Sequence, residues 1–138
     1  MNAKHSVLSV FITLLLALFA CSEDGTSGGE LSFDFPDSNL SFSADIRPIF
    51  LNSCALAGCH TTPDPQNGLD LGALEPTFTN SFGQPVVIPW IKESSRLWNL
   101  IQGPYDGLPQ MPRQGRLLVE EEIRAIGTWI DEGADIFN

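Results

Sequence analysis

Basic residues are scarce in this sequence, and so are the side chains that bind metals or form disulfides. Against 17 Asp and Glu there are 7 Lys and Arg, which gives the 138-residue chain a formal net charge of −10. A nucleic-acid binder shows a basic stripe, so this charge excludes nucleic acid as a partner. With 3 Cys the chain is no disulfide scaffold, and the absence of an internal repeat excludes solenoids and propellers. The length fits one small globular domain.

The first 21 residues have the pattern of an export signal. A short start with one Lys leads into a largely apolar run from Val7 to Ala20, and Cys21 follows. The run is shorter than the ~20 residues that a membrane-spanning helix needs, so it favours a cleaved signal peptide. The segment from Leu18 to Cys21 resembles a bacterial lipobox. This resemblance implies a lipoprotein signal peptide over residues 1–20, a lipid on Cys21 and a membrane anchor in the bacterial cell envelope, facing the periplasm or the outside.

The segment after Cys21 lacks the residues that form a core. Residues 22–30 contain three Gly, three acids and no aliphatic residue, so they cannot bury apolar surface. We therefore predict a flexible tether over residues 21–42 and a folded domain over residues 43–138.

Three of the scarce side chains are clustered. Beyond residue 21 the chain keeps one His, one Met and two Cys, and Cys54, Cys59 and His60 fall within seven positions. The attachment motif of covalent haem is C-x-x-C-H, in which two thiolates bond to vinyl groups and the adjacent His reaches the iron. Here four residues separate the thiols. The two extra residues are expected to loop out, and Gly58 favours such a loop.

Two other interpretations of this cluster stay open on the residues alone. A disulfide between Cys54 and Cys59 is chemically reasonable in an exported protein. A zinc site is less favoured, because structural zinc usually takes four Cys or His ligands and only three are available.

An amphipathic helix is predicted before the cluster and another near the C-terminus. Ser43 or Asp45 is expected to cap the first, with Pro48 in its first turn. The second is predicted from Glu120 to Ala134, since its acids crowd the first turn and apolar residues recur at helical spacing. We expect Gly133 to cap its end and the mid-helix Gly127 to allow close contact with the first helix.

The connections between these helices are rich in proline. Pro109 and Pro112 flank Met111, which favours a stiff extended loop that presents one thioether. Residues 61–89 are predicted to form turns and extended loop around a cofactor, with no chemistry of their own. Six apolar residues are candidates for the cofactor wall, or else for ordinary core: Phe50, Leu97, Trp98, Leu100, Ile101 and Trp129.

From about Asp45 to Asp135 the sequence resembles the small c-type cytochromes of bacteria, in particular planctomycete-type cytochrome c domains. The resemblance rests on Ile46-Arg47-Pro48-Ile49-Phe50, Cys54…Cys59-His60, Gly68-Leu69-Asp70-Leu71, Ser95-Arg96-Leu97-Trp98, Met111-Pro112 and Trp129 to Ala134.

This resemblance implies an all-α, cytochrome c-like domain with three or more helices and long loops around one covalent haem c. It implies thioether bonds to Cys54 and Cys59, with His60 as proximal and Met111 as distal iron ligand. An iron with both ligands has no open position, so we expect an electron carrier and not an enzyme, with redox proteins as donor and acceptor. The alternatives are a haem-binding sensor, a subunit of a larger redox enzyme, or a haem-free lipoprotein with a disulfide.

The few cations are unevenly placed. Lys92, Arg96, Arg113 and Arg116 fall within 25 residues of an otherwise acidic chain. Two hypotheses follow: the cations surround the exposed haem edge and steer an acidic partner, or one or two of them, with Trp90 or Tyr105, neutralise haem propionates.

Overall fold

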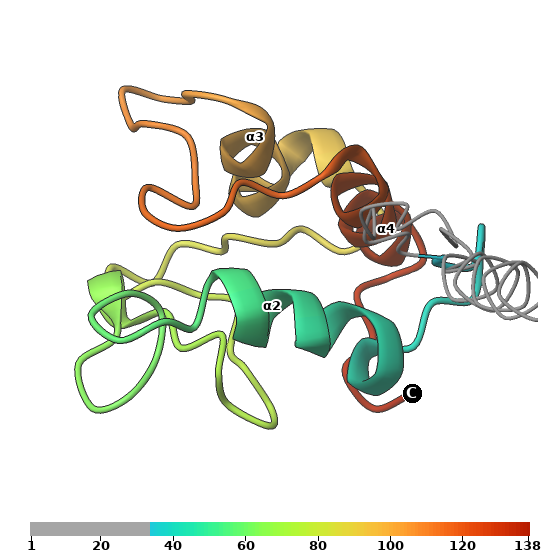
Figure 1. The fold of residues 1–138 in the computed structure, drawn as a ribbon, viewed down its shortest axis with the longest axis horizontal. Helices are drawn as coiled ribbons and strands as arrows, with labels where there is room; N and C mark the ends of the chain where they lie inside the picture. Colours follow the sequence, from blue (N-terminus) through green and yellow to red (C-terminus); the bar gives the residue numbers. More distant parts are fainter. Residues whose placement is uncertain (1–33) are drawn as a thin grey trace, which may run out of the picture. The chain divides into compact units, whose positions relative to one another are not determined.

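The computed structural model describes residues 34–138 (Figure 1). The predicted signal peptide, Cys21 and most of the predicted tether lie outside the described residues. The described part contains no β-strand, so the prediction of an all-α fold with three or more helices is confirmed at that level. Its elements are η2 (Phe42–Ile46), α2 (Arg47–Ser53), η3 (Gln66–Gly68), η4 (Lys92–Ser94), α3 (Arg96–Gln102) and α4 (Glu120–Asp131). Among these residues no helix is long and apolar enough to cross a membrane.

The first helix begins earlier than predicted. Ser41, and not Ser43 or Asp45, is its N-cap, and the Ser41 hydroxyl accepts the N–H of Ala44 at 3.2 Å. Asp45 takes part as the reciprocal partner, because its carboxylate accepts the N–H of Ser41 at 2.8 Å. Two of the free N–H groups at the helix start are thereby satisfied. Pro48 lies in the first turn of α2, which follows η2 directly, and so not in the first turn after the Ser41 cap.

Packed structure also begins before residue 43. Leu40 and Phe42 are buried, although the sequence places them on the tether side of the predicted boundary. The carboxylate of Glu132 accepts the N–H groups of Asn39 (2.6 Å) and Leu40 (3.0 Å). The side chain of Asn138 accepts the N–H of Phe42 at 2.8 Å and donates to the carbonyl of Leu40 at 3.0 Å. These bonds join the start of the described chain to its end.

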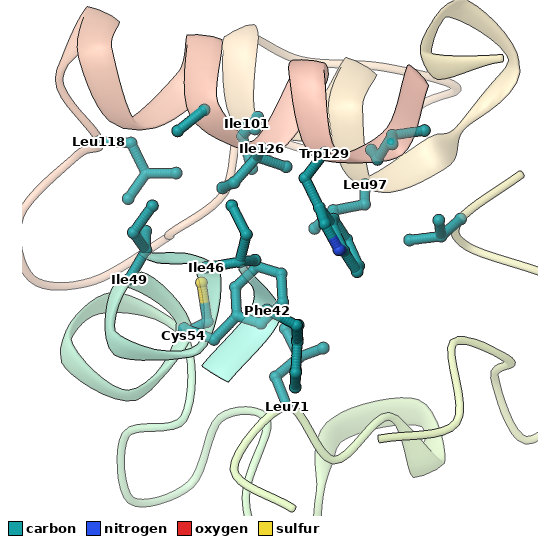
Figure 2. Close-up of a cluster of buried hydrophobic side chains, with 14 of the residues drawn as sticks. Phe42, Ile46, Ile49, Cys54, Leu71, Leu97, Ile101, Leu118, Ile126 and Trp129 are labelled. Atoms are coloured by element: carbon teal, nitrogen blue, oxygen red, sulfur yellow. The ribbon is translucent and has the colours of Figure 1, made fainter. Parts of the chain in front are cut away.

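The core lies between η2 and α2 on one side and α3 and α4 on the other (Figure 2). Four aromatic rings form its centre, with centroids 5.4 Å apart for Phe78 and Trp129 and 5.6 Å apart for Phe42 and Trp129. Phe50, the fourth, is fully buried and tilted against Phe42. Edge-to-face and tilted contacts of this kind add to the free energy gained by burial.

Helix α4 ends at Asp131, three residues before the predicted end. Gly133 has φ +109° and donates its N–H to the Ile130 carbonyl at 3.0 Å, while Ala134 donates to the Trp129 carbonyl at 2.9 Å. This pair of bonds is a Schellman motif, so the prediction that Gly133 caps the helix is confirmed.

Gly127 permits a close contact, but not with the first helix as predicted. A Cβ at position 127 would overlap the ring of Trp98, which packs from α3 onto the backbone of α4. Apolar spacing identifies the helices around Ile49 and Ile126 but not the short α3 that carries Trp98.

Gly127→Ala is expected to destabilise the fold although Ala favours helix. The added methyl meets the half-buried ring of Trp98 at a distance that the packing cannot accommodate, and overpacking of this kind costs about 1–3 kcal/mol, against the ~1 kcal/mol gained in helix propensity. Urea unfolding measures the difference. Gly103→Ala is the matched control, because a Cβ there meets open space at an ordinary φ, and it should leave the free energy of unfolding nearly unchanged. Equal effects of the two substitutions would contradict the contact.

Candidate cofactor cavity

His60 and Met111, far apart in sequence, line one cavity. Its volume is about 320 Å³, within the range of about 300–1,000 Å³ typical of ligand sites. The lining residues come from the loops after α2, from α3 and from the loop after α3, and they are His60, Asn67, Leu69, Leu71, Asn80, Phe82, Gln84, Val86, Arg96, Leu97, Leu100, Leu108 and Met111. Six of the thirteen are aliphatic Leu or Val, so the cavity offers a largely apolar space to a ligand.

His60 is held by three hydrogen bonds. Its backbone N–H donates to the Cys54 carbonyl at 3.1 Å, and its own carbonyl accepts the N–H of Leu71 at 2.9 Å. The ring nitrogen Nδ1 lies 3.2 Å from the Leu69 carbonyl oxygen. Because a carbonyl only accepts, Nδ1 carries the ring proton of the neutral imidazole, and Nε2 keeps the lone pair that binds a metal. A backbone carbonyl on the far nitrogen is a usual support for a ligating His.

The segment between the two thiols forms a closed loop, as predicted. Cys59 donates its N–H to the Leu56 carbonyl at 2.9 Å, and the next residue, His60, bonds back to Cys54. Gly58 has φ +77°, a conformation that side-chain-bearing residues rarely adopt, so the glycine is required by the backbone here. The two ends of the segment are thereby brought together.

The thiols themselves do not line the cavity. Both are free and unbonded to each other; Cys59 is half-buried, and the sulfur of Cys54 lies inside the core near Ile46 and Ile49 (Figure 2). Burial raises the pKa of the Cys54 thiol to about 12, and the charge of Glu122 and then Cys59 add to this effect. A thiol in this position is protonated and inert at neutral pH.

Met111 lies in an extended loop, as predicted from the flanking prolines. The described chain has no helix between Gln102 and Glu120. The N–H of Met111 donates to the Leu100 carbonyl at 2.8 Å, and the side-chain amide of Gln110 donates to the Ile101 carbonyl at 3.1 Å. Both acceptors belong to the last turns of α3, where helical carbonyls lack internal partners. The loop is thus attached to the same helix that forms one wall of the cavity.

Farther along this loop, Arg116 forms a bidentate ion pair with the buried carboxylate of Glu122, with both N···O distances 2.7 Å. Glu122 also accepts the N–H of Val119 at 3.0 Å, which caps α4 although Val119 offers no capping oxygen of its own. The sequence signal for this cap is Glu at the third position of the helix. The hydrogen bond to Glu122 raises the pKa of Arg116.

Two of the six candidate wall residues line the cavity. Leu97 and Leu100 line the cavity, while Phe50, Ile101 and Trp129 belong to the core and Trp98 packs on Gly127. Loop residues 61–89 supply seven of the lining residues, including three amides, although the sequence assigned them no chemistry. These residues follow no periodic pattern, and their composition alone offers no signal that would have found them.

The four clustered cations do not act as one group. Lys92 is paired with Asp131, Arg96 with Asp106 and Arg116 with Glu122. Of the four, only Arg96 lines the cavity. No group of three or more His, Cys, Asp or Glu among residues 34–138 is arranged to hold a metal ion.

The two thiols should differ sharply in reactivity toward iodoacetamide. With a pKa of about 12, Cys54 is ionised in roughly one molecule in ten thousand at pH 8, and the fraction rises tenfold with each pH unit up to that pKa. We expect peptide mass mapping to find label on the half-buried Cys59 first and on Cys54 only after unfolding in urea. A Cys59→Ser chain is the control and should stay unlabelled at position 54 until urea is added. Equal labelling of both thiols in the folded chain would contradict the buried position of Cys54.

The chain matches no protein-family model, no curated protein and no solved structure. What it does must therefore be argued from the cavity and from the residues that line it.

Proposed function

We propose that this chain is a small c-type cytochrome that holds one covalent haem and carries single electrons in the bacterial cell envelope. One observation carries the proposal. The imidazole of His60 and the thioether of Met111 line the same largely apolar cavity, and the Nδ1 of His60 is bound so that Nε2 is left for a metal. These are the scarce ligands that the sequence singled out, brought together by two separate loops.

The chain's own residues have distinct tasks in this proposal. His60 and Met111 hold the iron, and the Leu69 carbonyl fixes the ring of His60. The aliphatic side chains of Leu97 and Leu100 keep water from the ring. A haem with these two ligands exchanges one electron at a relatively high potential, since Met ligation and burial both favour the reduced iron. With no open position on the metal, the protein relays electrons between redox proteins and is not itself an enzyme.

The thiols stand beside the proximal ligand in sequence but not at the cavity. Cys54 and Cys59 belong to the segment that ends at His60, yet neither lines the cavity, so thioethers to the ring require both sulfurs to face it. Since Cys54 is protonated and buried in the core of the chain without haem, we assign attachment to the unfolded chain, which would then fold with this sulfur at the ring and not in the core. The lipid on Cys21 that the sequence indicates would tether this carrier to a membrane.

Haem loading tests the proposal directly. We expect the chain, exported in a bacterial host with the cytochrome c maturation system, to keep its colour through acid–acetone extraction. The pyridine haemochrome spectrum should be of the c type, and the mass should rise by one haem. Cys54→Ser/Cys59→Ser should lose the colour on extraction. Deleting Ala55 and Leu56 creates the common C-x-x-C-H spacing as a control for recognition by the host. If the parent and the shortened chain are both colourless while a reference cytochrome in the same host is loaded, the alternative of a haem-free, disulfide-bonded lipoprotein is favoured.

Met111→Ala tests the sixth ligand. Loss of the thioether should lower the reduction potential and open the reduced iron to carbon monoxide, which the parent should exclude. Leu108→Ala is the matched control, because it removes a side chain from the same loop and cavity without removing a ligand. Carbon monoxide binding by the parent would instead support a sensor, and an unchanged potential in Met111→Ala would exclude Met111 as ligand.

A further inference from the structure

The cavity carries a single permanent charge. Among its lining residues Arg96 is the only one that is always ionised, and there is no acid. Three amides, from Asn67, Asn80 and Gln84, accompany it, and the rest of the lining apart from His60 is apolar. In a chain of net charge −10, a cation without an acid in the lining favours one class of ligand: an apolar body that ends in a negative group.

Arg96 is held by a partner that is easily exchanged. Its guanidinium donates to the carboxylate of Asp106 at 2.9 Å, and the Asp106 side chain is 65% exposed. Exposed ion pairs contribute little to stability, so little is lost when another carboxylate takes the place of Asp106. A carboxylate inside the half-enclosed cavity interacts more strongly with the same guanidinium, because the local dielectric constant is lower.

The position of Asp106 is set by a tight turn. Tyr105 and Leu108 exchange two backbone hydrogen bonds of 3.0 Å, with Asp106 at φ +51° and Gly107 at φ +74° between them. This is the type I′ turn that an Asp-Gly pair favours. Leu108 of the turn lines the cavity, and the chain continues to Met111. The acid that holds Arg96 therefore belongs to the same loop as the candidate iron ligand.

The other cations of the described part lie outside the cavity lining. Arg116 is bound to the buried Glu122, Lys92 to Asp131 and Arg124 to Asp37. Arg47 donates to the Gly72 carbonyl at 3.2 Å, and Arg113 is exposed and absent from the lining. Trp90 and Tyr105, which the sequence also offered for a negative group of the ligand, are exposed and absent from the lining, so Arg96 is the one of these residues at the cavity.

We propose that Arg96 is the carboxylate-binding residue of the cavity and that it exchanges Asp106 for a carboxylate of the bound ligand. Where that ligand is the haem of the proposed function, the carboxylate is a propionate, and in this form the inference rests on that function. Asn80 and Gln84 line the same cavity, and the side-chain amide of Asn80 donates to that of Gln84 at 3.1 Å. Binding then releases Asp106, so that occupation of the cavity is transmitted to the turn that precedes Met111.

The first test uses the haem-loaded protein. Without Arg96, the pKa of the nearby propionate should rise by about 1–3 units, so the reduction potential of Arg96→Gln should vary with pH in a range where the parent's does not. Arg96→Lys keeps the charge and should retain most of the parent profile. Arg113→Gln is the matched control, since it removes an exposed cation outside the cavity. Coincident pH profiles of Arg96→Gln and the parent would overturn the proposal.

The second test uses the full chain exported without haem attachment. Its probes are 2-naphthoate and the neutral 2-naphthalenemethanol, which share an apolar body and differ in charge. Naphthoate should bind at least tenfold more tightly, Arg96→Gln should abolish that preference, and Asp106→Asn should increase naphthoate affinity because it removes the competing acid. Equal binding of both probes by the parent would contradict the proposal.

The two tests separate this inference from the proposed function. If no host loads haem while the preference for naphthoate holds, the proposed function fails and the carboxylate site stands. If haem loads and Arg96→Gln changes neither the pH profile nor the preference for naphthoate, the carboxylate site fails and the proposed function stands.

Discussion

One buried carboxylate, that of Glu122, joins the start of α4, the end of the loop that carries Met111 and, through Arg116, the end of α2. It caps the first turn of α4 through the N–H of Val119 and binds both terminal nitrogens of Arg116. Arg116 reaches on to the hydroxyl of Ser53, at 3.4 Å, in the last residue of α2. Because an unpaired buried carboxylate costs roughly 1–3 kcal/mol or more, the pair holds the returning end of the Met111 loop against both helices.

The rest of the cavity is positioned mainly by backbone hydrogen bonds between loops. Leu97 donates to the Val86 carbonyl at 2.8 Å, and the buried hydroxyl of Ser95 accepts the N–H of Ile88 at 2.8 Å. Ser81 donates to the Asn67 carbonyl at 2.7 Å. Loops lack the repeated backbone hydrogen bonds of helices and sheets. Their side chains therefore keep fixed positions only when individual backbone groups are paired in this way. Such bonds connect the loops after α2 to one another and to the start of α3.

The sequence predicted what depends on periodicity or on scarcity. The helices around Ile49 and Ile126 follow from apolar spacing, and His60 and Met111 stand out because few other metal ligands exist. It failed where a contact depends on tertiary structure. Nothing near Gly127 indicates that Trp98 is its partner. The missed N-cap is a local case: Ser41, Ser43 and Asp45 all offer a capping oxygen, and residue type does not show which of them binds the N–H of Ala44. Arg96 could not be separated from the neighbouring cations until their acidic partners were known.

The contact between Trp98 and Gly127 makes the helical side of the cavity stiffer than the loop side. The ring of Trp98 lies directly against the backbone of α4 at Gly127, so α3 cannot slide along α4 without a clash. The facing side consists of loop, with the three-residue η3 as its only helix and with Asn67, Phe82 and Gln84 exposed. A bulky ligand would therefore widen the cavity by displacing the loop side. The helical side would keep its shape, so Leu97 and Leu100 would keep their positions relative to the ligand.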